Sequence, residues 1–137
     1  MQTSCFNRYE GENGIAICLF PPKGYVGPSY NDLKPDKDTF YLIKSGQIDQ
    51  AEYEERYFRN TLSKLDPQEV YNNLKGKVIL CWEKPIFDTG GQIINKGSGF
   101  CHRHLVSKWI AAKLDIAVQE WRTPNEIQKI KNSIPLF

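Results

Sequence analysis

Apolar and polar residues alternate along the chain in blocks whose lengths and spacing predict strands and helices in turn. Residues 14–20 and 77–83 form two short apolar runs, each followed within two residues by proline, which is typical of buried strands. The second run is almost continuously apolar and therefore predicts a central strand covered on both faces, as in a parallel sheet. A third, shorter strand is predicted at 116–118.

Apolar residues at helical spacing predict helices between the strands. Tyr53, Tyr57 and Phe58 recur on one face of residues 49–65, so we expect a helix there with these three rings in the core. Residues 66–76 follow with an aspartate cap, a proline in the first turn and a glycine at the end, the signature of a second helix.

The C-terminal third predicts two further helices. Residues 101–114 form the first, and we expect Arg103 to point away from its apolar face and His104 and Lys108 to be solvated. The second begins at Thr123, where a cap residue precedes a proline. The expected inward contacts are His102, Leu105, Val106, Trp109 and Ile110 in the first helix and Ile127, Ile130 and Ile134 in the second.

Strands that alternate with helices predict crossover connections and parallel pairing. We therefore expect a single three-layer α/β domain over residues 1–137, with a mainly parallel sheet and flanking helices. A chain of 137 residues is long enough to bury a core without disulfides or metal.

Charge and cysteine content exclude several classes of protein. Eighteen Lys and Arg against sixteen Asp and Glu give a net charge of +2, which offers no reason to expect non-specific binding to nucleic acid or to an anionic membrane. Motifs of sequence-specific nucleic-acid binding are absent, and no apolar run reaches the ~20 residues of a membrane span. Residues 1–8 do not resemble a secretory signal, so we expect a cytoplasmic protein with four free thiols, among them a buried Cys18.

The most informative residues cluster where the 77–83 strand ends and the 101–114 helix begins. Open parallel sheets bind ligands outside the carboxyl ends of their strands, and the loop after Phe20 should open on the same edge. The sequence therefore predicts a small-ligand site at this edge. Its expected members are Cys81, Glu83, Cys101, His102 and Arg103, joined by Lys23 and Tyr30 from the loop.

These residue types allow catalysis on an anionic ligand such as a nucleotide or another phosphate compound. Cys101 near a helix N-terminus would hold a stabilised thiolate and act as nucleophile, with Glu83 and His102 as proton carriers. Arg103 would clamp the anion beside the free helix N–H groups. Lys23 would neutralise charge, and Tyr30 and Cys81 would complete the ligand-binding residues.

Each of these residues also has a structural interpretation. Cys101 can simply start a helix, His102 can be a core histidine, and Arg103 can form a salt bridge with Glu83. The chain would then be a non-catalytic protein-interaction module, whose loops at 23–31 and 86–100 carry recognition.

Two further ideas concern the cysteines. Cys81 and Cys101 would form a redox switch if their Cα atoms lie within about 7 Å. Cys81, Cys101 and His102 have ligand types that suit zinc, but they number only three and their spacing matches no usual zinc motif. We therefore expect no metal site and no other cofactor.

Several segments resemble the domain-of-unknown-function family 488. The resemblance covers residues 14–121 and is carried by a Cys-x-Glu motif at 81–83 and a Cys-His-Arg motif at 101–103. Trp109, the Val-Gln-Glu-Trp segment ending at Trp121 and the Pro-Lys-Gly of the early loop add to it. The chain departs from the family in a longer, glycine-rich insert between the two motifs. The resemblance implies a compact α/β domain of bacterial or phage origin with its polar residues at the same edge, and no assigned activity.

Overall fold

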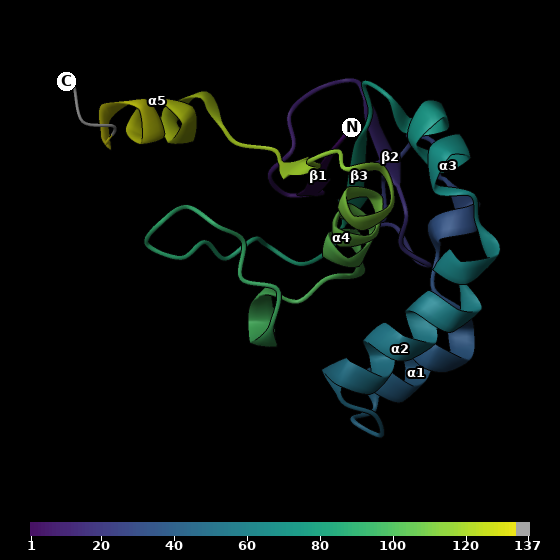
Figure 1. The fold of residues 1–137 in the computed structure, drawn as a ribbon. Helices are drawn as coiled ribbons and strands as arrows, with labels where there is room; N and C mark the ends of the chain where they lie inside the picture. The colour runs from purple at the N-terminus through teal and green to yellow at the C-terminus, as the bar shows by residue number, and fades with distance from the viewer. Residues whose placement is uncertain (134–137) are drawn as a thin grey trace.

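The computed structural model describes residues 1–133, which form an α/β fold around one four-stranded sheet (Figure 1). All strand pairs are parallel and the order across the sheet is β2-β3-β1-β4. The α/β class and the parallel sheet expected from the sequence are confirmed. The strands are β1 (Gln2–Cys5), β2 (Gly14–Ala16), β3 (Val78–Cys81) and β4 (Gln119–Glu120), and the helices are α1 (Lys37–Lys44), α2 (Gln50–Asn60), α3 (Pro67–Leu74), α4 (His102–Leu114) and α5 (Pro124–Ser133).

The main core lies on the sheet face that carries Ile79 and Cys81. The crossovers from β2 to β3 and from β3 to β4 step in the same direction across the sheet, so right-handed connections place their helices on one face. Ile79 and Cys81 accordingly share one buried cluster with residues of α2, α3 and α4. Among these are Tyr53, Tyr57, Leu74, Val106 and Ile110.

The opposite face is covered by the segment between β1 and β2. This connection, residues 6–13, steps back across β3 and brings the Tyr9 ring against the sheet. A methyl group at Gly14 would lie 2.7 Å from Leu80 Cδ1 and 3.3 Å from the Tyr9 ring, so the absence of a side chain permits this close packing. Leu80 faces this side because alternate residues of a strand point to opposite faces.

The strand predictions are correct in type and less accurate in extent. The 77–83 strand is central as expected, but it pairs only over Val78–Cys81, and the 14–20 strand is reduced to Gly14–Ala16. The strand expected at 116–118 is wrong, because pairing with β1 begins only at Gln119. No apolar run marks β1, whose buried Thr3 and Ser4 are polar, and the sequence gives no sign of this strand.

The four predicted helices all occur, and α1 is a further helix that was not predicted. The Asp66 side chain accepts a hydrogen bond from the Gln68 backbone N–H, and Pro67 begins α3, as predicted. The 49–65 helix ends earlier than expected, at Asn60, and a separate 3-10 turn follows. Among the 133 described residues, no helix is both long and apolar enough to cross a membrane.

Three apolar residues expected in the core are not buried. Phe58 of α2 is 49% exposed, because the helical rotation of about 100° per residue turns it away from the face that Tyr53 and Tyr57 bury. Ile127 and Ile130 of α5 are 44% and 39% exposed, since α5 extends from the edge of the sheet beyond β4 (Figure 1). The predicted contact of Ile134 lies outside the described residues.

Candidate functional site

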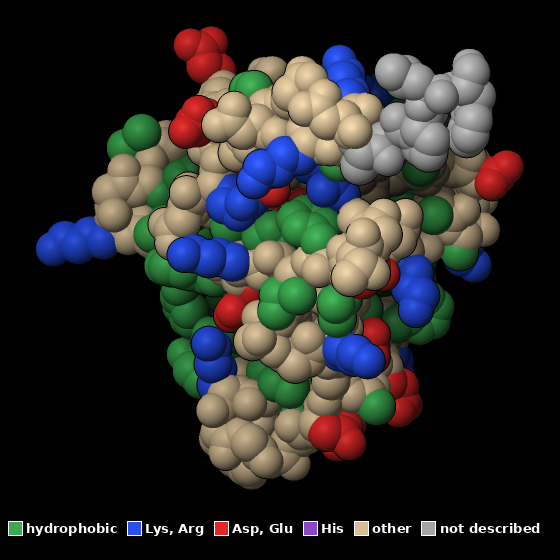
Figure 2. All heavy atoms as spheres, turned by 90° about the vertical axis from the view of Figure 1, so that its left-hand side faces the viewer, with side chains coloured by type: hydrophobic (Ala, Val, Ile, Leu, Met, Phe, Trp, Pro, Cys, Tyr) green, Lys and Arg blue, Asp and Glu red, His purple; other side chains and the backbone are tan. Residues whose placement is uncertain are grey.

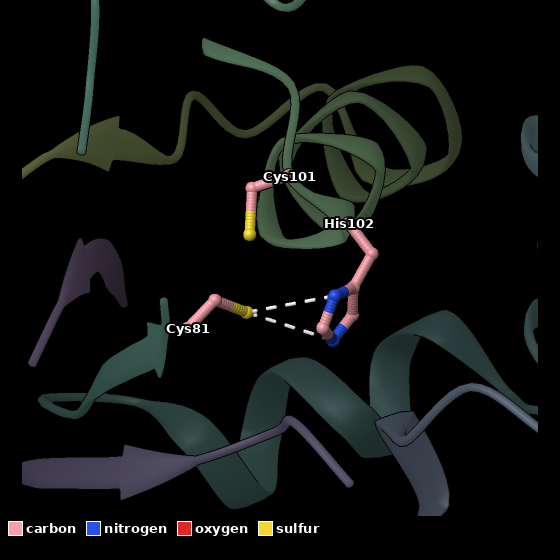
Figure 3. A group of neighbouring side chains, drawn as sticks. All are labelled: Cys81, Cys101 and His102. Atoms are coloured by element: carbon pink, nitrogen blue, oxygen red, sulfur yellow. Dashed lines mark hydrogen bonds between the residues drawn. The ribbon is translucent and has the colours of Figure 1, made fainter. Parts of the chain in front are cut away.

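Cys81, Cys101 and His102 come together at the junction of β3 and α4 (Figure 3). Their two sulfur atoms and a ring nitrogen all lie within 4.8 Å of one another, and all three residues are buried. The sequence prediction that these residues converge at the strand-end edge is therefore correct for this part of the site.

Each side chain is placed by the end of an element. Cys81 is the last residue of β3, Cys101 is the residue that precedes α4, and His102 is the first residue of that helix. The backbone N–H of Cys101 donates to Asn95 Oδ1 at 3.2 Å, which ties the start of α4 to the preceding loop. A strand and the helix that follows the glycine-rich loop thus present their polar groups to one point.

The orientation of the His102 ring is set by a backbone carbonyl. His102 Nε2 lies 2.8 Å from the carbonyl oxygen of Ile17, and because that oxygen can only accept, Nε2 carries the hydrogen and donates it. The Cys81 sulfur lies 3.6 Å from Nδ1 and 3.5 Å from Nε2, beside the ring edge between the two nitrogens. The rings of Tyr57 and His102 pack in a T-shaped arrangement, with their centroids 5.4 Å apart.

The two thiols have opposite acidities. Burial raises the pKa of the Cys81 thiol well above its usual value, and the hydrogen bond and charge of Cys101 add to this effect. Burial also acts to raise the pKa of Cys101, but hydrogen bonds with Cys81 and His102 and the positive charges of His102 and Arg103 outweigh it and hold that pKa well below its usual value. Of the two thiols, Cys101 is therefore the one whose surroundings favour the thiolate, and Cys81 is the one whose surroundings favour the protonated form.

A cavity of about 340 Å³ adjoins the three side chains. Its walls are mainly apolar and include Leu19, Phe40, Ile43, Trp82 and Phe100. Phe40 and Ile43 belong to α1, which no sequence pattern had connected with the site. Two charged residues, Lys44 and Glu83, also line it, and both are exposed to solvent. The cavity therefore connects the buried sulfur atoms with the surface.

The structure brings only part of the predicted ligand-binding set to this cavity. Glu83 lines it together with Cys81, Cys101 and His102, whereas Lys23 and Tyr30 are not among its lining residues. The Tyr30 hydroxyl instead accepts a hydrogen bond from Asn73 at 3.0 Å, and Lys23 lies exposed in the turn after Pro22. The loop at 23–31 thus does not extend over the site.

Arg103 is not among the residues that line the cavity, and its surroundings also differ from the two other predictions made for it. It is fully buried, so the expectation that it points away from the core is wrong, and its bidentate partner is Glu120 and not Glu83. The reason is the helical rotation of 100° per residue, which turns Arg103 from the cavity towards β4. Thr3 completes this buried group by donating to Glu120 Oε1 at 2.6 Å.

His104 is likewise buried, against the prediction that it is solvated, whereas Lys108 is exposed as expected. Burial, together with the charge of Arg103, lowers the pKa of His104 to about 4. Its Nε2 atom has no hydrogen-bond partner among residues 1–133. The sequence could not show this burial, because β1 and β4, which close this side of α4, were not predicted where they occur.

His104 lines a second hollow, of about 1220 Å³, along a different face of α4. Lys108, Arg122 and Lys129 are among its lining residues, between the 86–100 loop and α5. Figure 2 shows this side of the molecule, with Lys and Arg side chains gathered around a hollow. The hollow is separate from the cavity beside Cys101, with which it shares no lining residue.

No protein-family model, curated protein or solved structure matches this chain. The resemblance to the domain-of-unknown-function family 488 accordingly stays a prediction. The site must be interpreted from its own geometry.

Proposed function

We propose that the protein binds a small ligand in the cavity beside β3 and α4 and that Cys101 attacks this ligand as a nucleophile. The observation that carries the proposal is the convergence of Cys81, Cys101 and His102 within 4.8 Å on the wall of a cavity. A sulfur atom at a helix N-terminus, with positively charged neighbours, is the environment in which a thiol becomes reactive.

The walls of the cavity indicate which ligands fit. Arg103 is occupied by Glu120, so Lys44 is the positively charged residue that lines the cavity. Most of the remaining surface is aromatic or aliphatic. We therefore propose a ligand with an apolar body and at most one anionic group, which Lys44 would neutralise.

The side chains support acyl transfer. The Cys101 thiolate would form a bond to the acyl carbon, the bond from that carbon to the leaving group would break, and the leaving group would take the proton of the Cys81 thiol. Water would then cleave the thioester, release the carboxylic acid and return one proton to the pair of sulfur atoms. His102, held by the carbonyl of Ile17, orients its ring edge towards Cys81 throughout.

The test is covalent labelling with a panel of small thioesters and activated esters, read by intact mass and peptide mapping. We expect an acyl adduct on Cys101 that forms and then decays, and no adduct in Cys101→Ser. Cys5→Ser is the matched control, since Cys5 is equally buried but belongs to no lining segment of the cavity. No adduct on the wild type, or an adduct on another cysteine, would refute the proposal even if a variant failed to fold.

A second candidate function, a non-catalytic protein-interaction module, is favoured by a different observation. Phe20, Tyr41 and Trp82 are 47%, 55% and 48% exposed and lie near one another. Phe40 packs edge-on against both Phe20 and Tyr41, and the Trp82 indole N–H donates to the Phe20 carbonyl. Exposed aromatic groups of this kind are enriched at protein interfaces.

Two single variants distinguish the two candidate functions. A partner recognised through the aromatic group would be lost with Tyr41→Ala and retained with Cys101→Ser. Acyl transfer would instead be retained with Tyr41→Ala, because Tyr41 does not line the cavity, and lost with Cys101→Ser. In either case we propose a cytoplasmic protein, because all four cysteines lie in the described residues as free thiols, which suits a reducing compartment.

A further inference from the structure

We propose that Cys81, Cys101 and His102 form a binding site for a soft divalent transition metal ion, with Zn²⁺ as the expected ion and one coordination position open to the cavity. The proposal goes beyond the nucleophilic role assigned above, because it adds a metal-bound state in which the same two sulfur atoms are ligands.

The spacing of the ligand atoms supports this. Zinc–sulfur bonds of about 2.3 Å and zinc–nitrogen bonds of about 2.0–2.1 Å place neighbouring ligand atoms of a tetrahedral site roughly 3.5–3.8 Å apart. The distance from Cys81 Sγ to His102 Nδ1 is 3.6 Å, and all three ligand atoms lie within 4.8 Å of one another.

The arrangement around His102 supports it independently. Histidine ligands almost always donate their other ring N–H to a carbonyl or carboxylate, which fixes the nitrogen that faces the metal. His102 Nε2 donates to the Ile17 carbonyl at 2.8 Å, which leaves Nδ1 on the side of the sulfur atoms (Figure 3). The hydrogen bond from a ligand histidine to an orienting carbonyl, which is typical of metal sites, is therefore already present.

Neighbouring residues in sequence can serve as ligands here because the helix begins between them. Cys101 has extended backbone angles and His102 is the first helical residue, so the two side chains leave the chain in directions that converge on Cys81. The spacing of the residues along the sequence cannot predict this change of backbone conformation between Cys101 and His102. With three protein ligands on the wall of a cavity, the fourth position is open to water or to a ligand, as in catalytic zinc sites.

The proposal is tested by adding Co²⁺, then Zn²⁺, to the metal-free protein. We expect one Co²⁺ per chain with a thiolate-to-cobalt charge-transfer band and the ligand-field bands of tetrahedral geometry, both abolished by Zn²⁺. The bands should be lost in Cys81→Ser and retained in Cys5→Ser, a matched control because Cys5 pairs with Cys81 in register on the adjacent strand. Absence of the charge-transfer band in the wild type, or its equal loss in Cys5→Ser, would overturn the proposal.

X-ray absorption of the Zn²⁺-loaded wild type provides a test that needs no variant. We expect two sulfur atoms and one imidazole nitrogen in the first shell, and a shell made only of oxygen and nitrogen would refute the site. The result is independent of the acyl-transfer proposal, whose labelling is done on metal-free protein in the presence of a chelator. Zn²⁺ should block that labelling, since both sulfur atoms are then engaged.

Discussion

Arg103 and Glu120 form a buried, bidentate ion pair that joins the first turn of α4 to β4, with Nε–Oε1 and Nη2–Oε2 distances of 3.0 and 2.8 Å. Both side chains are almost fully inaccessible to solvent. The pair therefore anchors the helix that carries Cys101 and His102 to β4.

Replacing one partner of this pair should destabilise the fold strongly. Glu120→Gln leaves the guanidinium without its counter-charge in the interior, and we expect the free energy of unfolding to fall by about 3–5 kcal/mol. Urea denaturation measures this loss. The double variant Arg103→Met with Glu120→Leu should recover much of the loss, because no charge is then buried; a double variant less stable than either single one would contradict the interpretation.

Asp36 should stabilise α1 in a pH-dependent way. Its carboxylate accepts hydrogen bonds from the backbone N–H and the hydroxyl of Thr39 and from Asn60. Burial acts to raise the pKa of Asp36, but these hydrogen bonds prevail and lower it below 3.8. A folded-state pKa below the unfolded value means that the contribution is present above about pH 4 and is lost as the pH falls through the folded-state value.

We therefore expect Asp36→Ala to lower the free energy of unfolding by about 1 kcal/mol at pH 7, the usual value of an N-cap. The difference from wild type should shrink towards pH 2, measured by denaturation at several pH values. A difference that is constant across this range would show that the carboxylate charge has no part in it.

Tyr57 supports the site by packing against His102 and by one hydrogen bond to the backbone of Leu33. Its hydroxyl donates to the Leu33 carbonyl at 2.7 Å in the interior, and its ring packs against that of His102 in a T-shaped pair. Tyr57→Phe leaves that carbonyl without its partner, and we expect a loss of about 1–2 kcal/mol in thermal or chemical denaturation. Tyr41→Phe, at an exposed ring, should change stability by much less, and an equal effect of the two variants would refute this assignment.

Mild hydrogen peroxide should join Cys81 to Cys101. The Cys101 thiolate is oxidised to a sulfenic acid, the Cys81 thiol condenses with it and water is released, so the chain loses two hydrogen atoms. Intact mass spectrometry and peptide mapping after oxidation measure this loss and its location. A disulfide that involves Cys5 or Cys18, or overoxidation of Cys101 with no disulfide, would be inconsistent with the observed proximity of the two sulfur atoms.

Particular residues show what sequence reasoning could and could not provide. The apolar run at 77–83 and the capping residues at 66–67 are local signals. Both elements occur, the strand over the shorter range Val78–Cys81. The convergence of Cys81, Cys101 and His102 followed from the parallel sheet alone, because parallel strands place their carboxyl ends at one edge. Arg103 could not be placed in this way, since its partner Glu120 belongs to a two-residue strand whose pairing with β1 depends on the completed sheet.

Local sequence patterns also could not predict which residues line the cavity. Phe40 and Lys44 belong to α1, a helix that was not predicted, and they reach the site through the packing of α1 against α2. His102 was correctly expected on the inward face of its helix, but its bond to Ile17 depends on a contact across 85 positions of the chain. Long-range contacts of this kind define the chemistry of the site.

The central claim is that Cys101 is a reactive thiolate accessible from the cavity, and the most direct measurement is the alkylation rate of each cysteine in metal-free native protein. Cys18 is the internal reference, because it lines the same cavity while burial raises its pKa to about 11. With iodoacetamide at neutral pH and quantification by peptide mapping, we predict that Cys101 is labelled first and clearly faster than Cys18, with the difference lost in urea. Labelling of Cys18 before Cys101, or equal rates for both in the native protein, would contradict the account.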